Sequence, residues 1–593
     1  MIEYNARSTG CGNINAEHVG KQVTLAGWVN RRRDHGTIIF IDIRDRSGLM
    51  QLVISPELSA QSHKQAQEIR SEYVIAIKGT VVERAAQSQN NNIKTGKWEV
   101  QVSELNILNT AKTLPFSLED ASCVDEEIRL TYRYLDLRRP EMHQVIAFRH
   151  KIIFAIREFF NREEFYEIET PILTKNTAEG AREFLVPSRV NQGNWYALPQ
   201  SPQVYKQLLM AGGMDKYFQI ARCFRDEDLR ADRQPEFTQL DIEMSFITES
   251  DIQSLVERLI AHVYKITLNQ SIQLPLRRMT YDHAFSTYGS DKPDLRLDLP
   301  IIDLSKSFEG TPITFLQSEL SKRGKIGALC IQDQSFSRGE LDAWTDKARK
   351  AGASGLLWIK MNQEGEIESP LAKHLDEQQM TKIKQAIPHF APGDTLFIVA
   401  GKYNMAWTAL GRLRLLLGAA LNLIDTTRDE FLWVVDFPLV EWNEEQKRFT
   451  SMHHPFTRPQ DGWEDREPST LTARSYDIIL NGIELGGGSI RIHEKELQRK
   501  VFDFLGLDES DMKGHFGFLL EAQELGFPPH GGLAIGLDRL IMLMLGKASI
   551  RDCIAFPKTS TGADLLLNAP TPVSEVKLKE YGLQVIKKAA KKE

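Results

Sequence analysis

The 593-residue sequence contains few cysteines, no long apolar run and no excess of positive charge. Its five cysteines are scattered and form no CxxC pair, which argues against a disulfide framework or a cysteine-based zinc site. No apolar stretch approaches the roughly 20 residues of a membrane span, and no signal peptide is recognised. These absences predict a cytoplasmic protein with reduced thiols and no place in a membrane.

The formal net charge of −7 argues against a protein coated with nucleic acid, although a local basic surface can still bind a folded RNA. Hydrophobic residues make up 42% and charged residues 26% of the chain, which is typical of a globular protein. A chain of this length is too long for a single core, so we expect roughly three to five domains. No internal repeat or low-complexity segment interrupts the sequence.

Five short strand patterns separated by turn residues predict a small barrel of the OB-fold type in residues 1–107. The strands are expected at Val23–Val29, Ile38–Arg44, Met50–Ile54, Val74–Lys78 and Trp98–Val102. Arg31, Arg32 and Arg33 precede the second strand, where a solvated turn is the simplest interpretation. Beside an outward-facing Phe40, however, these arginines could pair with phosphates while bases stack on the ring, so we favour RNA binding.

Alternating residues in the segment 216–246 predict an antiparallel hairpin with a charged turn from Asp228 to Glu236. Its second strand has an apolar face and a polar face, formed by Leu240, Ile242, Met244 and Phe246 and by Gln239, Asp241, Glu243 and Ser245, respectively. A polar strand face is usually solvated, but the flanking segments are apolar enough to cover both faces. The loop residues Arg233, Gln234 and Phe237 could clamp a phosphate and stack a purine.

Several runs together resemble the class II aminoacyl-tRNA synthetases. FRDE (224–227) with RQPEF (233–237) is similar to motif 2 of that family, Pro171 to the proline of motif 1, and GLAIGLDRL (532–540) to motif 3. The run QSPQ (200–203) followed by Lys206, the barrel run GWVNRRRDHG (27–36) and an insertion after motif 2 resemble the bacterial-type aspartyl enzymes of subclass IIb. The sequence contains no GxGxxG, HIGH or KMSKS signature that would favour a Rossmann fold.

The resemblance implies an α+β protein whose catalytic core is an antiparallel sheet flanked by helices, with an N-terminal OB-fold barrel and an inserted α+β domain. Apolar residues at helical spacing predict a helix over 141–161 at the start of the core, and the basic segment Lys577–Lys592 predicts a surface helix. We expect a barrel at 1–107, a hinge at 108–140, core segments at 141–287 and 423–561 around an insertion at 288–422, and an extension at 562–593. The insertion contains no catalytic constellation that we recognise, and its charged run YGSDKPDLR (288–296) predicts a loop.

The resemblance also implies an amino-acid site that selects aspartate. Its residues would be Glu179, Ser201, Gln203, Lys206, Arg225, Asp241, His453 and Arg491. Lys206 and Arg491 would hold the side-chain carboxylate, and neutral asparagine would be rejected because it leaves a charge unpaired. From the residues alone, a lone lysine on a helix is most often solvated. A metal bound by His453 and His454 is disfavoured because adjacent side chains on an extended chain point apart.

A nucleotide site is implied in the same way, with Arg225, Glu227 and Arg539 as catalytic residues. ATP would contact Arg225, Asp226, Glu227, Gln234, Phe237, Glu484, Gly536, Leu537, Asp538 and Arg539. Asp477 and Glu484 flank an apolar strand and its turn, and two oxygen ligands facing a polyphosphate suit Mg²⁺. Arg539, buried in the first turn of an apolar helix with no acid nearby except Asp538, should be unfavourable unless an anion occupies the site.

For tRNA, the resemblance implies an anticodon surface on the barrel at Arg33, His35, Phe40 and Gln51, and a homodimer with Pro171 at its interface. His35 and Gln87 bear on whether the enzyme charges only tRNA(Asp) or also tRNA(Asn). His35 leads us to favour relaxed specificity, with a discriminating enzyme as the alternative. An asparagine-forming relative would lack the barrel, and a non-catalytic RNA-binding relative would be expected to have lost Arg225, Arg539 or Glu484.

Overall fold

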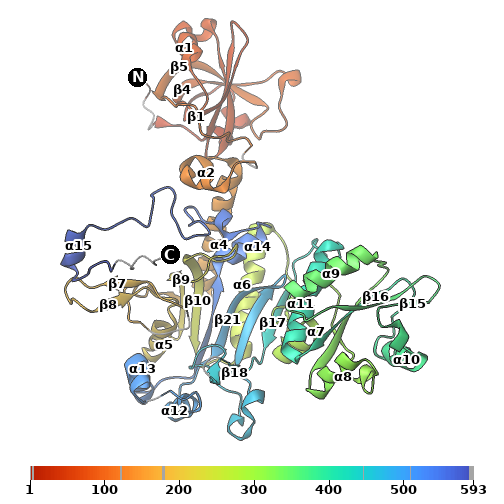
Figure 1. Ribbon diagram of the computed structural model, residues 1–593. Helices are drawn as coiled ribbons and strands as arrows, with labels where there is room; N and C mark the ends of the chain where they lie inside the picture. Colours follow the sequence, from red (N-terminus) through yellow and green to blue (C-terminus); the bar gives the residue numbers. More distant parts are fainter. Residues whose placement is uncertain are drawn as a thin grey trace. The chain divides into compact units, whose positions relative to one another are not determined.

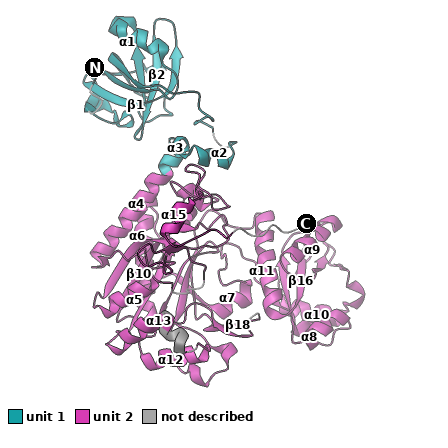
Figure 2. Ribbon diagram, turned by 60° about the vertical axis from the view of Figure 1, so that its left-hand side comes forward, with its two compact units in different colours: residues 1–144 teal, residues 145–593 magenta. Residues whose placement is uncertain are grey.

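The computed structural model describes residue 2 and residues 6–120, 123–176, 181–444, 447–507 and 509–586. The chain forms two compact units, Met1–Gln144 and Val145–Glu593, which are coloured separately in Figure 2. Each unit has a hydrophobic core of its own. None of the helices in these ranges combines the length and the apolar character that a membrane crossing requires.

The first unit is built on a closed barrel with the strand order β1-β2-β3-β5-β4, which confirms the predicted OB-fold. The elements are β1 (Gln22–Asp34), β2 (Ile39–Asp45), β3 (Gly48–Ile54), α1 (Pro56–Glu68), β4 (Val74–Glu83) and β5 (Trp98–Asn109). Ile39, Ile41 and Ile43 are fully buried inside the barrel, while Phe40 on the opposite face is partly exposed.

Two predictions for this unit need correction. The arginine run does not form a turn, because β1 continues to Asp34 and Arg33 pairs directly with Phe40 of β2. The segment expected to be irregular carries two short helices, α2 (Glu126–Thr131) and α3 (Arg133–Asp136). The ion pairs of Asp136 with Arg133 and Arg139 hold this segment together, since Asp136 is fully buried.

The second unit contains an eight-stranded sheet with the order β11-β17-β20-β21-β22-β10-β9-β6 (Figure 1). Only the edge pairs β11–β17 and β6–β9 are parallel. The strands are β6 (Tyr166–Glu167), β9 (Lys216–Phe224), β10 (Glu236–Ser245), β11 (Arg277–Thr280), β17 (Phe431–Val435), β20 (Ser475–Leu480), β21 (Ile483–Ile490) and β22 (His530–Gly536). The predicted antiparallel core and the helix α4 (Pro140–Arg162) are thus confirmed.

Helices and small hairpins complete the sheet domain. They are α5 (Gln203–Ala211), α6 (Glu249–Leu268), α7 (Tyr281–Tyr288), α12 (Lys495–Phe504), α13 (Glu509–Glu524), α14 (Leu537–Met544), α15 (Glu575–Glu580), β7–β8 (Leu185–Pro187, Trp195–Ala197) and β18–β19 (Val440–Asn443, Arg448–Ser451). Apolar side chains of α4, α6 and α14 pack with those of the sheet into one core. In the segment predicted as a C-terminal helix, α15 ends at Glu580, and the described residues 581–586 are not helical. The rest of the predicted segment, 587–592, lies outside the described residues.

The β9–β10 hairpin is the predicted one, with two differences. Its polar face is buried, and Asp241 and Glu243 have no exposed surface. Phe246 does not share the apolar face of Leu240 and Ile242, because β10 ends at Ser245 and Phe246 adopts a φ of 57°, leaving its side chain 72% exposed. Both faces of β10 are therefore buried.

Residues 302–420 form a second sheet with the order β12-β13-β16-β14-β15. Its elements are β12 (Ile302–Asp303), α8 (Thr314–Ser321), β13 (Lys325–Ile331), α9 (Arg338–Lys350), β14 (Leu357–Met361), β15 (Ile367–Glu368), α10 (Glu377–Ala386), β16 (Thr395–Gly401) and α11 (Tyr403–Ala420). Helices α9 and α11 cover one face of this sheet and α8 and α10 the other (Figure 1). The insertion thus has a sheet and apolar clusters of its own within the second unit, while its exact boundaries remain a prediction.

Candidate active site

A cavity of about 520 Å³ lies against the central strands of the eight-stranded sheet. Most of the predicted site residues line it: Ser201, Gln203, Lys206, Arg225, Glu227, Gln234, Phe237, Asp241, His453, Asp477, Glu484, Arg491, Gly536, Asp538 and Arg539. Arg225 and Arg539, which come from different motifs, therefore face one space. Part of the floor is bare backbone, contributed by Gly486, Gly487 and Gly488 of β21.

Two of the residues predicted for the amino-acid and nucleotide sites are not part of this lining. Asp226 is exposed, and its main-chain N–H donates to the carbonyl of Arg182 over 2.9 Å. Leu537 is fully buried in the core of the sheet domain, because it begins α14 with its side chain on the apolar face of that helix. Glu179 lies outside the described residues.

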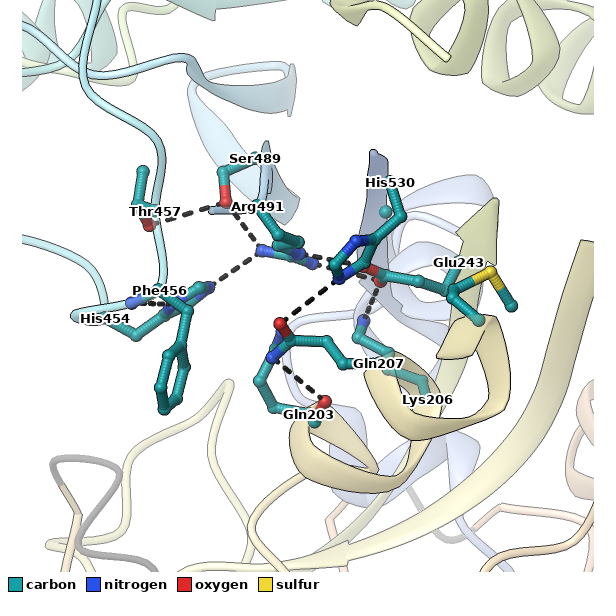
Figure 3. A network of polar contacts seen from close by, with 12 residues as sticks. Gln203, Lys206, Gln207, Glu243, His454, Phe456, Thr457, Ser489, Arg491 and His530 are labelled. Atoms are coloured by element: carbon teal, nitrogen blue, oxygen red, sulfur yellow. Dashed lines mark hydrogen bonds and ion pairs between the residues drawn. The ribbon is translucent and has the colours of Figure 1, made fainter. Parts of the chain in front are cut away.

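Two cations and two acids form a buried network in the half of the cavity that is predicted to bind the amino acid, called the amino-acid half below. Figure 3 shows Lys206, Arg491 and Glu243 of this network. Lys206 Nζ lies 2.7 Å from Asp241 Oδ1 and 3.3 Å from Glu243 Oε2. Arg491 Nε donates to Glu243 Oε1 over 2.9 Å, and its Nη2 donates to Oε2 over 3.2 Å. All four side chains are at most 2% exposed. In such a low-dielectric site, the loss of any one partner would leave a buried charge unpaired at a high cost in free energy.

The fold brings these four charges together from β10, from α5 and from Arg491, which directly follows β21. Asp241 and Glu243 share the polar face of β10, two residues apart, and Lys206 lies one turn into α5. Ser201 Oγ accepts from the main-chain N–H of Gln203, the first residue of α5. A Cβ at Gly532 of the neighbouring strand β22 would overlap the Glu243 carboxylate, so the glycine makes room for it.

The two acids respond differently to burial. Burial alone would raise the pKa of Glu243, but attraction to Arg491 and Lys206 exceeds that effect and lowers the pKa below its usual value. Burial also dominates for Asp241, and there the opposing attraction of Lys206 leaves the pKa raised. Asp241 Oδ2 and Gln203 Nε2, which both belong to residues of the lining, have no hydrogen-bond partner among the described residues. Both atoms are free to bind a ligand.

Sequence reasoning missed the residues that hold Arg491. Arg491 Nη1 donates to His454 Nε2 over 2.8 Å and to Ser489 Oγ over 2.6 Å (Figure 3). Burial, followed by the charge of Arg491, lowers the pKa of His454 well below its usual value, so the ring is neutral and can accept. Its neighbour His453 also lines the cavity, with its ring against that of Phe437. The sequence assigned only His453 to the site, but both histidines belong to the lining.

The nucleotide half of the cavity is more open. The Arg225 guanidinium lies 5.2 Å from the centre of the Phe237 ring, and its buried Nε has no partner among the described residues. Arg539 is half-buried rather than buried, and its Nη2 lies 3.2 Å from Asp232 of the motif 2 loop. This corrects the expectation that no acid other than Asp538 would lie near it. Arg539 Nη1 also donates to the Glu484 carbonyl, while its Nε is unpartnered within the same described set.

Other predicted nucleotide contacts have structural partners. Gln234 exchanges two hydrogen bonds with the main chain of Lys558, over 3.0 and 2.7 Å. Asp538 accepts from Arg149 Nη1 over 2.5 Å and from the main-chain N–H of Thr238 over 2.8 Å, which ties α14 to α4 and β10. Glu227 Oε2 accepts from Arg233 over 2.7 Å. Only the last of these pairs lies on the exposed loop, where partners exchange readily.

Asp477 and Glu484 lie on the β20–β21 hairpin, facing the cavity. The pKa of Asp477 is raised well above its usual value, first by burial and then by the negative charges of Glu484 and Asp291. The described residues contain no cluster of three or more typical metal ligands. Two crowded carboxylates do fit Mg²⁺, which keeps most of its waters and takes only one or two carboxylates beside a phosphate.

On the barrel, the predicted anticodon residues lie together. Arg33 Nη2 donates to Asp42 Oδ1 over 2.8 Å and to Gln51 Oε1 over 3.1 Å. The rings of His35 and Phe40 meet edge to face with centroids 5.5 Å apart. Gln51 Nε2 in turn donates to Glu99 Oε2 over 2.9 Å, a partner that the sequence did not indicate. Gln87 is exposed in a short 3₁₀ turn, and no described contact joins it to the others.

Comparisons with known proteins agree with this geometry. Residues 125–560 match the family model of the class II tRNA synthetases (D, K and N), and residues 23–108 match that of the OB-fold nucleic acid binding domain. The chain is 50% identical over 581 residues to the aspartate–tRNA ligase of Geobacillus kaustophilus (strain HTA426), covering 97% of this chain and 98% of that protein. It is 49% identical over 583 residues to the aspartate–tRNA(Asp/Asn) ligase of Heliobacterium modesticaldum (strain ATCC 51547 / Ice1), covering 98% and 96%.

Among solved structures, the asparaginyl-tRNA synthetase from Pyrococcus horikoshii complexed with asparaginyl-adenylate has the same fold. It superposes with a TM-score of 0.59 at 19% identity, covering 94% of this chain and 99% of that one. The family model spans most of the chain, and the relatives match it almost from end to end at half identity. The protein therefore belongs to the class II tRNA synthetases of the D, K and N group.

Proposed function

We propose that this protein is an aspartate–tRNA ligase, which activates L-aspartate with ATP to aspartyl-adenylate and then transfers the aspartyl group to the 3′ end of tRNA. The observation that carries the proposal is the buried pair Lys206 and Arg491 in the same cavity as Arg225 and Arg539. Two buried cations suit a substrate side chain that is itself a carboxylate. Since tRNA is charged in the cytoplasm, we expect the protein there.

The amino-acid half has donors to spare for a carboxylate. Of the three N–H groups of Lys206, two face Asp241 and Glu243, and of the five N–H groups of Arg491, four are engaged by Glu243, His454 and Ser489. One donor on each cation is left for the side-chain carboxylate of aspartate. Asp241 Oδ2, which has no partner among the described residues, would accept from the substrate ammonium, and Ser201 and Gln203 line the same cavity.

Asparagine would be rejected by the same arrangement. Its amide presents one acceptor oxygen and an NH₂ donor, so the NH₂ would face the free N–H of one cation. That buried N–H would then lack an acceptor, which costs several-fold to a few hundredfold in affinity.

Activation needs positioning and charge neutralisation rather than a general base, because the α-carboxylate is already a nucleophile at neutral pH. Arg225 would hold the α-phosphate and the incoming carboxylate, and Phe237 would stack on the adenine. Arg539 would turn from Asp232 to the γ-phosphate, while Glu227 would orient the nucleotide. Mg²⁺, held by Asp477 and Glu484, would supply further positive charge against the triphosphate when bound.

For the tRNA, Arg33, His35, Phe40 and Gln51 would form the surface that binds the anticodon. We favour an enzyme that charges both tRNA(Asp) and tRNA(Asn), with a discriminating enzyme as the alternative. The residue type at His35 supports relaxed specificity, and Gln87 favours neither case. Incubating the protein with purified tRNA(Asn) and radiolabelled aspartate tests this, since a flat time course would exclude the relaxed enzyme.

A homodimer and the domain boundaries belong to the same proposal. Exposed apolar side chains follow the motif 1 proline, with Ile172 48% and Leu173 52% exposed, as expected of a surface that another subunit covers. Light scattering should give twice the 67.5 kDa chain mass. Removing residues 1–107 should spare activation but cripple tRNA charging, because the barrel would contact only the tRNA.

The decisive experiment is ATP–pyrophosphate exchange with single amino acids. Exchange should depend on aspartate and remain at background with asparagine or lysine. Exchange that responds equally to lysine would contradict the role assigned to Lys206 and Arg491. A lack of exchange with any amino acid, from protein that binds ATP, would contradict the proposed activity.

A further inference from the structure

The charged run 288–296, which lies at the start of the insertion and was given no role, reaches into the catalytic cavity. Asp291 is part of the lining, beside Asp477, Glu484 and His453. The Lys292 Nζ lies 3.8 Å from Glu484 Oε2, and both side chains are about half exposed. The sequence of the insertion shows no catalytic constellation, and the place of Asp291 in the cavity lining becomes visible only in the fold.

The loop is fastened to the hairpin that carries Asp477 and Glu484. Gly482, at the turn between β20 and β21, has a φ of +78°, and a Cβ there would lie 2.8 Å from Asp294 Cβ. Asp294 itself is 4% exposed and binds Arg296 through both carboxylate oxygens, over 3.0 and 2.8 Å. Close backbone approach and a buried ion pair thus fix the position of Lys292 relative to Glu484.

The last helix of the insertion holds the same loop from the other side. Arg414 of α11 is 1% exposed and donates to main-chain carbonyls of the loop: Leu299 over 2.9 Å, Asp294 over 2.8 Å, and Leu297. Trp407 Nε1, about two turns earlier on the same face of α11, donates to the Ser286 carbonyl over 2.7 Å. The Arg414 guanidinium also lies 4.8 Å from the centre of the Tyr288 ring, at the start of the run. A buried guanidinium that binds main-chain carbonyls and a ring shapes the loop, since no described acid is in direct contact with it.

The lining of the nucleotide half contains more acids than cations, which bears on the role of Lys292. This lining includes three cations, Arg225, Arg233 and Arg539, but six acids: Glu227, Asp232, Asp291, Asp477, Glu484 and Asp538. An anionic nucleotide would meet net repulsion from these side chains. Lys292 adds a cation beside Glu484, and the ion pair described between them is long and exposed, so little free energy holds Lys292 to Glu484.

We propose that Lys292 binds the triphosphate of ATP, and that α11 of the insertion positions it there through Arg414. This inference rests on the proposed use of ATP and gives the insertion a part in the nucleotide site. The ammonium turns from Glu484 to a phosphate oxygen when the nucleotide enters. No covalent step is involved.

The test compares the full-length protein with Lys292→Met, which keeps the length and apolar stem of the side chain. Calorimetric titration with ATP, in EDTA and again with Mg²⁺, should show about tenfold weaker binding in both buffers. Adenosine, which lacks phosphate, should bind equally to both proteins. In pyrophosphate exchange, KM for ATP should rise while KM for aspartate stays unchanged.

Lys325→Met is the matched control. Lys325 is also a half-exposed lysine of the insertion, paired with Asp303 at 2.9 Å, and it is not part of the cavity lining. Its substitution should leave ATP affinity unchanged. ATP affinity of Lys292→Met within twofold of the wild type would overturn the proposal. Normal ATP binding without aspartate-dependent exchange in the wild type would instead overturn the proposed function and leave this inference standing.

The role of α11 is tested separately by Arg414→Met. Amide hydrogen exchange of residues 289–297 should accelerate, and ATP affinity should fall to about the level of Lys292→Met. Circular dichroism and the melting curve show whether the insertion still folds. A folded variant with a faster-exchanging loop but unchanged ATP affinity would refute the positioning role.

Discussion

The two halves of the cavity handle charge in opposite ways. In the amino-acid half, Lys206, Arg491, Asp241 and Glu243 are almost completely buried and mutually bonded. In the nucleotide half, Arg539 and Asp232 are 23% and 38% exposed, and the Arg233–Glu227 pair is similarly open. One half is bonded internally before any substrate arrives, whereas the other includes exposed pairs whose partners can be exchanged.

The difference follows from the two tasks. Selecting aspartate over asparagine requires fixed donors in a dry site, because an unpaired buried charge is what penalises the wrong amino acid. Binding and releasing a highly charged nucleotide and pyrophosphate requires cations whose partners are easily replaced, because solvated pairs are weak. We therefore expect the effect of removing a charge to follow its burial.

The largest effect is expected for Arg491→Leu. It removes five donors and leaves Glu243 buried with Lys206 as its only cation, so kcat/KM for aspartate in pyrophosphate exchange should fall about 1000-fold. The second unit should also lose about 3 kcal/mol of stability against urea. Arg458→Leu is a suitable control, because Arg458 pairs with Glu494 at 2.7 Å and is not part of the cavity lining. Near-normal exchange in Arg491→Leu would remove its assigned role.

Asp241→Asn should have the next largest effect. The amide keeps the shape of the carboxylate but withdraws the charge that we assign to the substrate ammonium, so KM for aspartate should rise about 100-fold with little change in KM for ATP. Glu236→Gln, on the same strand but paired with Arg222 and Lys558, is the control and should be close to wild type. Equal increases in both KM values would mean that the two halves are not separable.

Arg539→Met should have a smaller effect and on the other substrate, with KM for ATP rising about 30-fold and KM for aspartate unchanged. Asp232, the described partner of Arg539, allows a second test of the nucleotide half. Asp232→Asn should leave KM for ATP unchanged or lower it, because the acid competes with phosphate for the guanidinium. A large rise of KM in Asp232→Asn would show that this pair is structural, like those of the amino-acid half.

The smallest effect concerns pH. His530 lies behind the amino-acid half, with Nδ1 donating to the Pro528 carbonyl and Nε2 3.3 Å from Gln207 Oε1. Burial lowers its pKa from 6.5 to about 4. The unfolded chain therefore takes up the proton first, and stability should decline as the pH falls from 6.5 to 4, by at most about 3 kcal/mol.

His530→Asn should flatten that decline, as measured by urea denaturation of the full chain at pH 6.5 and pH 5. The nucleotide half contributes no comparable buried histidine among the described residues that line the cavity. An identical pH dependence in the wild type and the variant would show that other groups govern acid stability.

Local pattern was enough to predict the barrel strands, α4 and the β9–β10 hairpin, because periodicity reports which side of an element is covered. The alternation could not show that the polar face of β10 would be buried, since that depends on partners far away in the chain. Glu243 meets Arg491 across 248 positions, and Arg539 meets Asp232 across 307. Such pairs have no local signal.

The misjudged details have similar causes. Phe246 fits the apolar pattern, but one residue with positive φ ends the strand and turns the side chain outward. No site role is predicted for Asp291, because it lies in a charged loop at the start of the insertion. The position of a residue in the sequence does not show which cavity its loop reaches. Motif resemblance located the site, whereas the pairing within it required the fold.

The glycine floor limits how this pocket can evolve. Every substitution at Gly487 or Gly532 adds atoms, and the first of them would collide with Asp477 or Glu243, respectively. Mutation at the floor can only make the chamber smaller, so a lineage that adopted a bulkier amino acid would have to alter α5 or the His453–His454 segment. Directed libraries aimed at new amino acids should accordingly diversify those walls and leave the two glycines untouched.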